Sequence, residues 1–88
     1  MTEEEIKATV LRILGEIAPE ADLTRLKPDV SFRDQLDIDS MDFLNFVIAL
    51  DKELGVGIPE SAYPKLSTLK GCIGLLAQAK TVTTQRQI

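Results

Sequence analysis

The chain has 88 residues, a hydrophobic fraction of 44% and a formal net charge of −4 at pH 7, which bounds it to one small domain with a single core. The negative charge disfavours binding to the phosphate backbones of nucleic acids and favours partners with basic patches. With no histidine and one cysteine, the chain has no Ser-His or Cys-His nucleophilic couple, no intrachain disulfide and no Cys/His zinc site.

The amino-terminal segment, residues 1–5, is acidic where a secretory signal would be basic. No apolar run approaches the roughly 20 residues of a membrane span. We therefore expect a cytoplasmic protein that neither crosses a membrane nor binds a metal.

The first predicted element is a helix from Thr2 to Ile17. Thr2 and Glu5 have the Thr-x-x-Glu spacing of a capping box, in which each side chain accepts a hydrogen bond from the other residue's backbone. Apolar residues then recur at helical spacing and predict one stripe that faces a core. The stripe consists of Ile6, Val10, Ile13, Leu14 and Ile17. Pro19 forces the chain out of the helix soon afterwards.

A long connection follows from Ala18 to Asp39, and Pro28 argues against one continuous helix through it. Apolar residues recur along it, so we expect the connection to be held against the core, with a short turn after Ser31. These residues are Leu23, Leu26, Val30, Phe32, Leu36 and Ile38.

The second helix is predicted over Ser40 to Leu54, and Gly55 or Gly57 ends it. The segment from Pro59 to Tyr63 suits a short helix with proline at its first position. Pro64 is expected to close that short helix.

The last helix is predicted over Ser67 to Gln78, with Ser67 as its cap and Leu69, Ile73 and Leu76 facing inward. Gly71 and Gly74 each weaken this helix by roughly 1 kcal/mol relative to alanine. Cys72 lies near the core face, and we expect a buried thiol rather than a reactive one. Residues 1–79 then form the domain and residues 80–88 a flexible tail. The fold class is all-α, a small four-helix bundle of three main helices and one short helix with a long first loop.

The second helix carries two apolar stripes. The wider one predicts the core face and consists of Phe43, Phe46, Val47, Leu50 and Leu54. The other consists of Met41, Leu44 and Ile48 and lies roughly 100° or more around the helix. Asp39, Asp42 and Asp51 flank it, with Asn45 between them. The second stripe is either an exposed contact surface for a partner with a basic rim or a packing surface under the long connection, and spacing does not separate the two.

Asp39 and Ser40 open the second helix, and either residue is an ordinary helix cap. If Asp39 caps the helix, the Ser40 hydroxyl is free to point outward. Backbone N–H groups and the helix dipole favour a phosphate at this position. Asp37, Asp39 and Asp42 crowd the same place, which suits recognition by a basic enzyme better than binding of a free phosphate.

The stretch from Phe32 to Asp42 resembles the attachment region of acyl carrier proteins, in which an Asp-Ser-Leu at the start of the second helix carries phosphopantetheine. The similarity continues through Ala49–Val56, Ile58–Pro59 and Leu66–Leu69 and covers roughly residues 3–79. The resemblance implies a monomeric carrier without catalytic activity of its own. It would hold acyl groups as thioesters for enzymes of fatty-acid, polyketide or related biosynthesis.

The resemblance also assigns roles to residues. Ser40 would carry 4'-phosphopantetheine, donated by coenzyme A through a phosphopantetheinyl transferase, and Asp39 would help that transferase to dock. Enzymes that load or transfer acyl groups would bind a surface made of Met41, Asp42, Leu44, Asn45, Ile48 and Asp51. An acyl cavity is expected near Phe46, Leu50, Ile58 and Tyr63.

The sequence departs from the family pattern where Met41 replaces the usual leucine and where Asn45 and Lys52 replace acidic residues. These departures favour a specialised carrier over the housekeeping one. Two alternatives stay open: an aminoacyl or peptidyl carrier of a nonribosomal pathway, which uses the same serine, and an unmodified helical interaction module.

Overall fold

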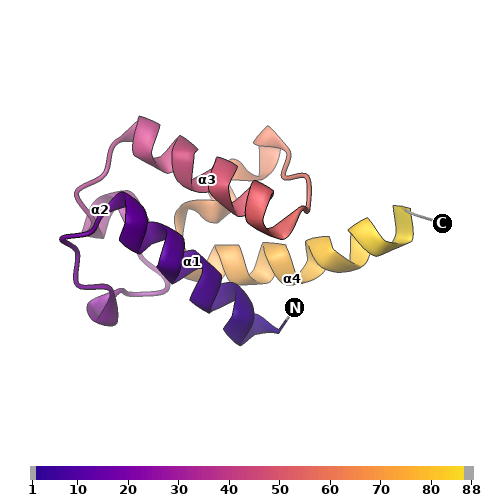
Figure 1. The fold of residues 1–88 in the computed structure, drawn as a ribbon, viewed down its shortest axis with the longest axis horizontal. Helices are drawn as coiled ribbons and strands as arrows, with labels where there is room; N and C mark the ends of the chain where they lie inside the picture. Colours follow the sequence, from indigo (N-terminus) through magenta and orange to yellow (C-terminus); the bar gives the residue numbers. More distant parts are fainter. Residues whose placement is uncertain (1, 87–88) are drawn as a thin grey trace.

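The computed structural model describes residues 2–86, with side chains from residue 2 to residue 77, and every regular element within that range is helical. Three long helices, α1 (Glu3–Ile17), α3 (Ser40–Leu54) and α4 (Leu69–Arg86), form the bundle. Shorter elements connect them: η1 (Leu23–Arg25), α2 (Phe32–Gln35) and η2 (Glu60–Ser67). The end of α1, the single turn of α2 and the start of α3 gather at one end of the molecule (Figure 1). The predicted all-α fold is confirmed.

Helix α1 begins as its sequence predicts. The Glu5 N–H donates to Thr2 Oγ1 at 3.1 Å, and the Thr2 N–H donates to Glu5 Oε1 at 2.8 Å. This reciprocal pair satisfies two backbone donors that have no partner within the helix. The predicted stripe is buried except for Ile17, which packs against its edge.

The core lies between α1, α3 and α4, with the long connection closing one side. Phe32 from α2 meets Phe46 from α3 edge to face, with ring centroids 5.3 Å apart. Burial of a large apolar side chain contributes roughly 1.5–3 kcal/mol, so this shared core is the main source of stability. Its members are Ile6, Val10, Ile13, Leu14, Phe32, Leu36, Phe46, Val47, Leu50, Leu66, Leu69, Cys72 and Leu76.

The long connection is held in place by its own hydrogen bonds. The Gln35 side-chain amide donates to the carbonyls of Lys27 and Val30, and its Oε1 accepts from the Lys27 N–H at 2.8 Å. The Lys70 N–H in α4 donates to the Pro28 carbonyl at 2.9 Å. With Phe32 and Leu36 buried, the predicted attachment of the connection to the core is confirmed.

Two details of the carboxyl-terminal half differ from the sequence prediction. The short helix is a 3₁₀ element that runs from Glu60 through Pro64 to Ser67, so Pro64 does not close it. Ala62 and Leu66 of this element are buried against the core. Its turns are tighter than those of an α-helix, because each backbone hydrogen bond spans three residues instead of four.

The last helix also starts and ends elsewhere. Thr68 caps it, because Thr68 Oγ1 accepts from the Gly71 N–H at 2.9 Å, whereas the Ser67 hydroxyl donates to the Pro64 carbonyl. Its backbone continues to Arg86, beyond the predicted end at Gln78. Of the predicted tail, residues 87–88 and the side chains of residues 80–86 lie outside the described part, so the boundary at residue 79 stays a prediction. None of the described helices combines the length and apolar character needed to cross a bilayer.

Candidate functional site

The start of α3 brings Asp39, Ser40 and Asp42 together. Asp39 is the cap: its Oδ1 accepts from the Asp42 N–H at 2.9 Å. Asp42 Oδ2 in turn accepts from the Asp39 N–H at 3.2 Å. Asp39 therefore performs the capping role that Ser40 could have taken.

Ser40 is the first residue of α3 and is exposed. Its hydroxyl makes no hydrogen bond to any residue that the structure describes. An exposed hydroxyl without an internal partner is accessible to a transferring enzyme. Its position at a helix amino terminus also favours a phosphate ester, because the backbone dipoles there point their positive ends at it. The residues present thus fit a phosphate-linked prosthetic group.

The second apolar stripe of α3 is exposed. Of the two alternatives that the sequence left open, an exposed surface and a packing surface under the long connection, the structure shows the exposed surface. Met41 is 63% exposed, Ile48 53% and Leu44 38%. The long connection packs instead against the other side of α3, where Phe32 contacts Phe46. The exposed stripe begins one residue after Ser40 and runs along the helix away from it.

The polar residues around this stripe have different surroundings. Asn45 and Lys52 are exposed, and Asp42 is half-buried. Asp51 is also half-buried, and its Oδ1 accepts from the Gly57 N–H at 2.8 Å. Asp51 thus anchors the turn after α3, a structural role that the sequence did not indicate.

The residues predicted to line an acyl cavity are closely packed. Phe46 and Leu50 have no exposed surface, and Ile58 and Tyr63 are half-buried. Tyr63 does line a hollow of about 390 Å³, but its walls come from Ser31, Arg33, Phe43, Pro64 and Ser67. The predicted cavity between α3 and η2 stays a prediction.

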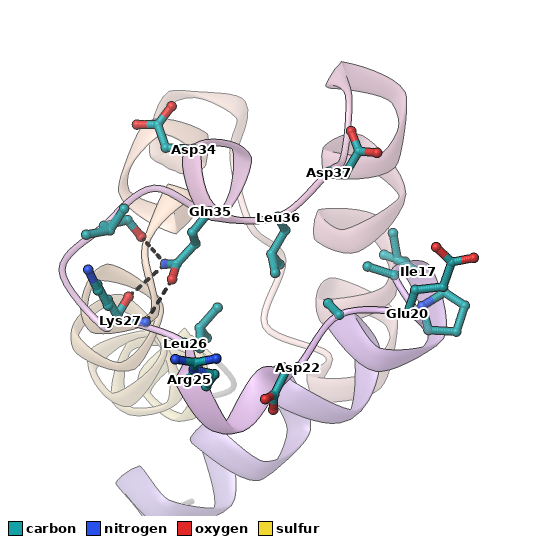
Figure 2. Close-up of a pocket in the computed structure, with 14 residues that line it drawn as sticks. Ile17, Glu20, Asp22, Arg25, Leu26, Lys27, Asp34, Gln35, Leu36 and Asp37 are labelled. Carbon is teal, nitrogen blue, oxygen red and sulfur yellow. Dashed lines mark hydrogen bonds between the residues drawn. The ribbon is translucent and has the colours of Figure 1, made fainter.

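A larger cavity of about 810 Å³ lies at the long connection and was missed by the sequence interpretation. We call it the first-loop cavity; residues 17–22, 25–27, 30 and 34–37 line it (Figure 2). Its apolar residues were visible in the sequence, but spacing alone did not show that they surround an open space.

Cys72 is buried, and its thiol donates to the Leu66 carbonyl at 3.3 Å. Burial raises the pKa of the thiol to about 12, because desolvation disfavours the thiolate. The expected burial of the thiol is confirmed.

Comparison with known proteins shows the family to which the chain belongs. The family described as "Phosphopantetheine attachment site" matches residues 4–76. An acyl carrier protein of Acidothermus cellulolyticus is 32% identical over 81 residues, which cover 90% of this chain and 93% of the relative. Acyl carrier proteins of Renibacterium salmoninarum and Zymomonas mobilis are 35% and 33% identical, over 88% and 90% of this chain and 94% and 95% of the relatives. The chain therefore belongs to the acyl carrier protein family, whose members are carriers with covalently attached 4'-phosphopantetheine.

Proposed function

We propose that this carrier holds acyl intermediates as thioesters on a 4'-phosphopantetheine arm attached to Ser40 and presents them to enzymes of fatty-acid, polyketide or related biosynthesis. The observation that carries the proposal is the exposed Ser40 hydroxyl, left without an internal partner because Asp39 caps the helix. Membership of the carrier family supplies the chemistry that such a serine performs.

Ser40 Oγ is the nucleophile in the attachment step. It forms a bond to the phosphorus of coenzyme A that bears the pantetheine, and the pyrophosphate bond breaks. Adenosine 3',5'-bisphosphate leaves, and the hydroxyl proton passes to a base of the transferase or to water. The thiol of the attached arm supplies the sulfur that holds the cargo.

The exposed stripe is the proposed docking surface for partner enzymes. Met41, Leu44 and Ile48 offer an apolar contact that fits a shallow groove. Asp39 and Asp42 lie at the Ser40 end of that stripe and attract a basic rim on the transferase and on acyl-transferring enzymes. Because each of these contacts is small, partners bind weakly and exchange readily.

The carrier itself contributes position rather than catalysis. Tethering raises the local concentration of the cargo and orients it at each partner in turn. Exposed Lys52 offsets part of the negative charge of the three flanking aspartates, and exposed Asn45 adds no charge to it. This supports a specialised carrier that serves one pathway, for which we propose a cytoplasmic location. Robust elongation of its cargo by the general fatty-acid synthase enzymes would contradict the specialised role.

The attachment step is tested by incubating the apo chain with coenzyme A, magnesium and a broad-specificity phosphopantetheinyl transferase, followed by intact mass measurement. We expect the wild type to gain one phosphopantetheinyl group and Ser40→Ala to gain none. Ser61→Ala is the matched control, since Ser61 is exposed on η2 and has no assigned role. Absence of a mass gain with several transferases would favour the unmodified interaction module.

A further inference from the structure

Charge is distributed unevenly along the chain. Residues 1–60 contain all 14 acidic residues and six of the ten basic ones, which gives that part a formal charge of −8. Residues 61–88 contain four basic residues and no acidic one, a formal charge of +4. A surface of one sign attracts partners of the other sign. The segment after Glu60, which holds η2 and α4, is therefore the basic part of an acidic protein.

Two basic side chains of this segment are free on the surface. Lys65 on η2 and Lys70 on α4 are both exposed. Neither forms an ion pair with a residue whose side chain the structure describes, whereas Arg12 pairs with both Glu16 and Glu53. The ammonium groups of these two lysines are thus available to carboxylates of another molecule.

A surface hollow of about 470 Å³ lies beside Lys65, between η2 and α4. A Cβ added at Gly74 meets no atom within 4 Å, so the hollow is open above this glycine. Lys70 precedes Gly74 by four residues and therefore shares its face of α4. The hollow is lined by Pro64, Lys65, Ser67, Thr68, Gly71, Gly74 and Leu75.

The shape and charge of this surface indicate what covers it. A helix presents convex side chains that fit a hollow, and carboxylates on the same helix reach the flanking lysines. A bilayer surface is flat, and anionic lipids repel a protein with a net charge of −4. A second copy of the chain carries that same net charge and is repelled as well.

We propose that η2 and the first turns of α4 form a second docking surface, which binds an acidic amphipathic helix of a partner protein. This surface shares no residue with the exposed stripe of Met41, Leu44 and Ile48. A partner on α4 therefore need not displace a basic enzyme from α3. The contact is weak because the hollow is small, and it holds the carrier near an enzyme that the stripe then engages.

The test is a titration of the full ¹⁵N-labelled chain with a synthetic helical peptide of alanine, leucine and glutamate, followed by amide chemical shifts. We expect shifts at Ser67, Thr68, Gly71 and Gly74, and a Kd that rises when salt increases from about 20 mM to about 200 mM. A matched peptide with lysine in place of glutamate should leave these amides unchanged. No shift at these amides, or shifts confined to α3, would overturn the proposal.

Variants separate the charge of the surface from its shape. Combined Lys65→Glu and Lys70→Glu should raise the Kd about 5- to 10-fold, whereas Lys7→Glu on α1 should not. Gly74→Leu fills the hollow without changing the charge and should also raise the Kd, whereas Ala8→Leu at an exposed position of α1 should not. An unchanged Kd in Gly74→Leu would show attraction by charge alone and would contradict binding in the hollow.

The other possible occupants are tested with the same amides. Shifts caused by vesicles of phosphatidylglycerol and phosphatidylcholine, but not by the peptide, would assign the surface to a membrane and overturn the proposal. Shifts that depend on carrier concentration alone would assign it to a second copy, with the same consequence. The combined lysine variant should still gain one phosphopantetheinyl group, since this surface acts independently of Ser40. Failure of the wild type to gain that group would contradict the proposed function and leave the docking result to be judged by the titration.

Discussion

Gly71 and Gly74 should respond in opposite directions to the same substitution by alanine. At Gly74 an added Cβ meets no atom within 4 Å, and the residue is exposed within α4. Alanine there removes backbone freedom from the unfolded chain at no steric cost, so Gly74→Ala should stabilise the fold by about 0.5–1 kcal/mol. For a domain of this size that corresponds to a rise in Tm of roughly 2–8 °C.

At Gly71 the added Cβ would lie 1.9 Å from the Lys65 carbonyl oxygen, against the 3.4 Å at which ordinary contact begins. The obstacle is backbone, so η2 and α4 must separate. Overpacking of this kind costs roughly 1–3 kcal/mol, which outweighs the helix gain of about 1 kcal/mol. Gly71→Ala should therefore be less stable than the wild type by up to about 2 kcal/mol.

Urea unfolding followed by circular dichroism, with the slope m checked for constancy, measures both changes. Each variant serves as the control for the other, because the chemical change and the helix are the same. A Gly71→Ala variant as stable as the wild type would refute the close approach of α4 to Lys65. A destabilised Gly74→Ala would refute the open surroundings of that glycine.

Three further predictions concern the site and its support. Asp39→Ala removes the cap and should lower stability by about 1 kcal/mol, whereas Asp39→Asn keeps an acceptor for the Asp42 N–H and should be as stable as the wild type. Both variants lose the carboxylate, so the transferase should load both more slowly. Ile48→Glu should raise the KM of the transferase for the carrier about 5- to 10-fold without loss of stability. The control Ala8→Glu on α1 should change neither the KM nor the stability. An unaffected KM in Ile48→Glu would exclude Ile48 from the docking surface. The folded state keeps the Cys72 proton up to a pKa of about 12, whereas the unfolded chain releases it above about pH 9. The thiol's contribution to the free energy of unfolding is therefore complete at neutral pH. It falls by up to ~1.4 kcal/mol per pH unit between those two values. Cys72→Ala should remove that part of the alkaline slope, and equal slopes would contradict the buried thiol.

Local signals in the sequence predicted the helix starts that depend on local contacts. The capping box of Thr2 and Glu5 joins residues three apart, so its geometry follows from spacing. For α3 the sequence left the cap open between Asp39 and Ser40, and the structure assigns it to Asp39. Adjacent hydroxyls gave no such guidance: Ser67 and Thr68 are both ordinary caps, and only the folded chain shows that Thr68 performs the role.

Tertiary contacts decided what spacing left open. The sequence placed two apolar stripes on α3 and predicted the wider one as the core face, but could not tell whether the long connection would cover the second. The contact between Phe32 and Phe46 fixes that choice and leaves Ile48 in solvent. The first-loop cavity likewise lies beside hydrogen bonds that join Gln35 to Lys27 across eight residues, a contact that spacing in the sequence does not show.

The central claim is that Ser40 carries the arm, and peptide mapping tests it most directly. Cleavage after Arg33 and Lys52 releases the peptide of residues 34–52, in which Ser40 is the sole side chain bearing a hydroxyl group. After incubation with coenzyme A and a transferase, the account predicts that this peptide gains the mass of one phosphopantetheinyl group and that no other peptide does. A mass gain on any other peptide, with residues 34–52 unmodified, would contradict it.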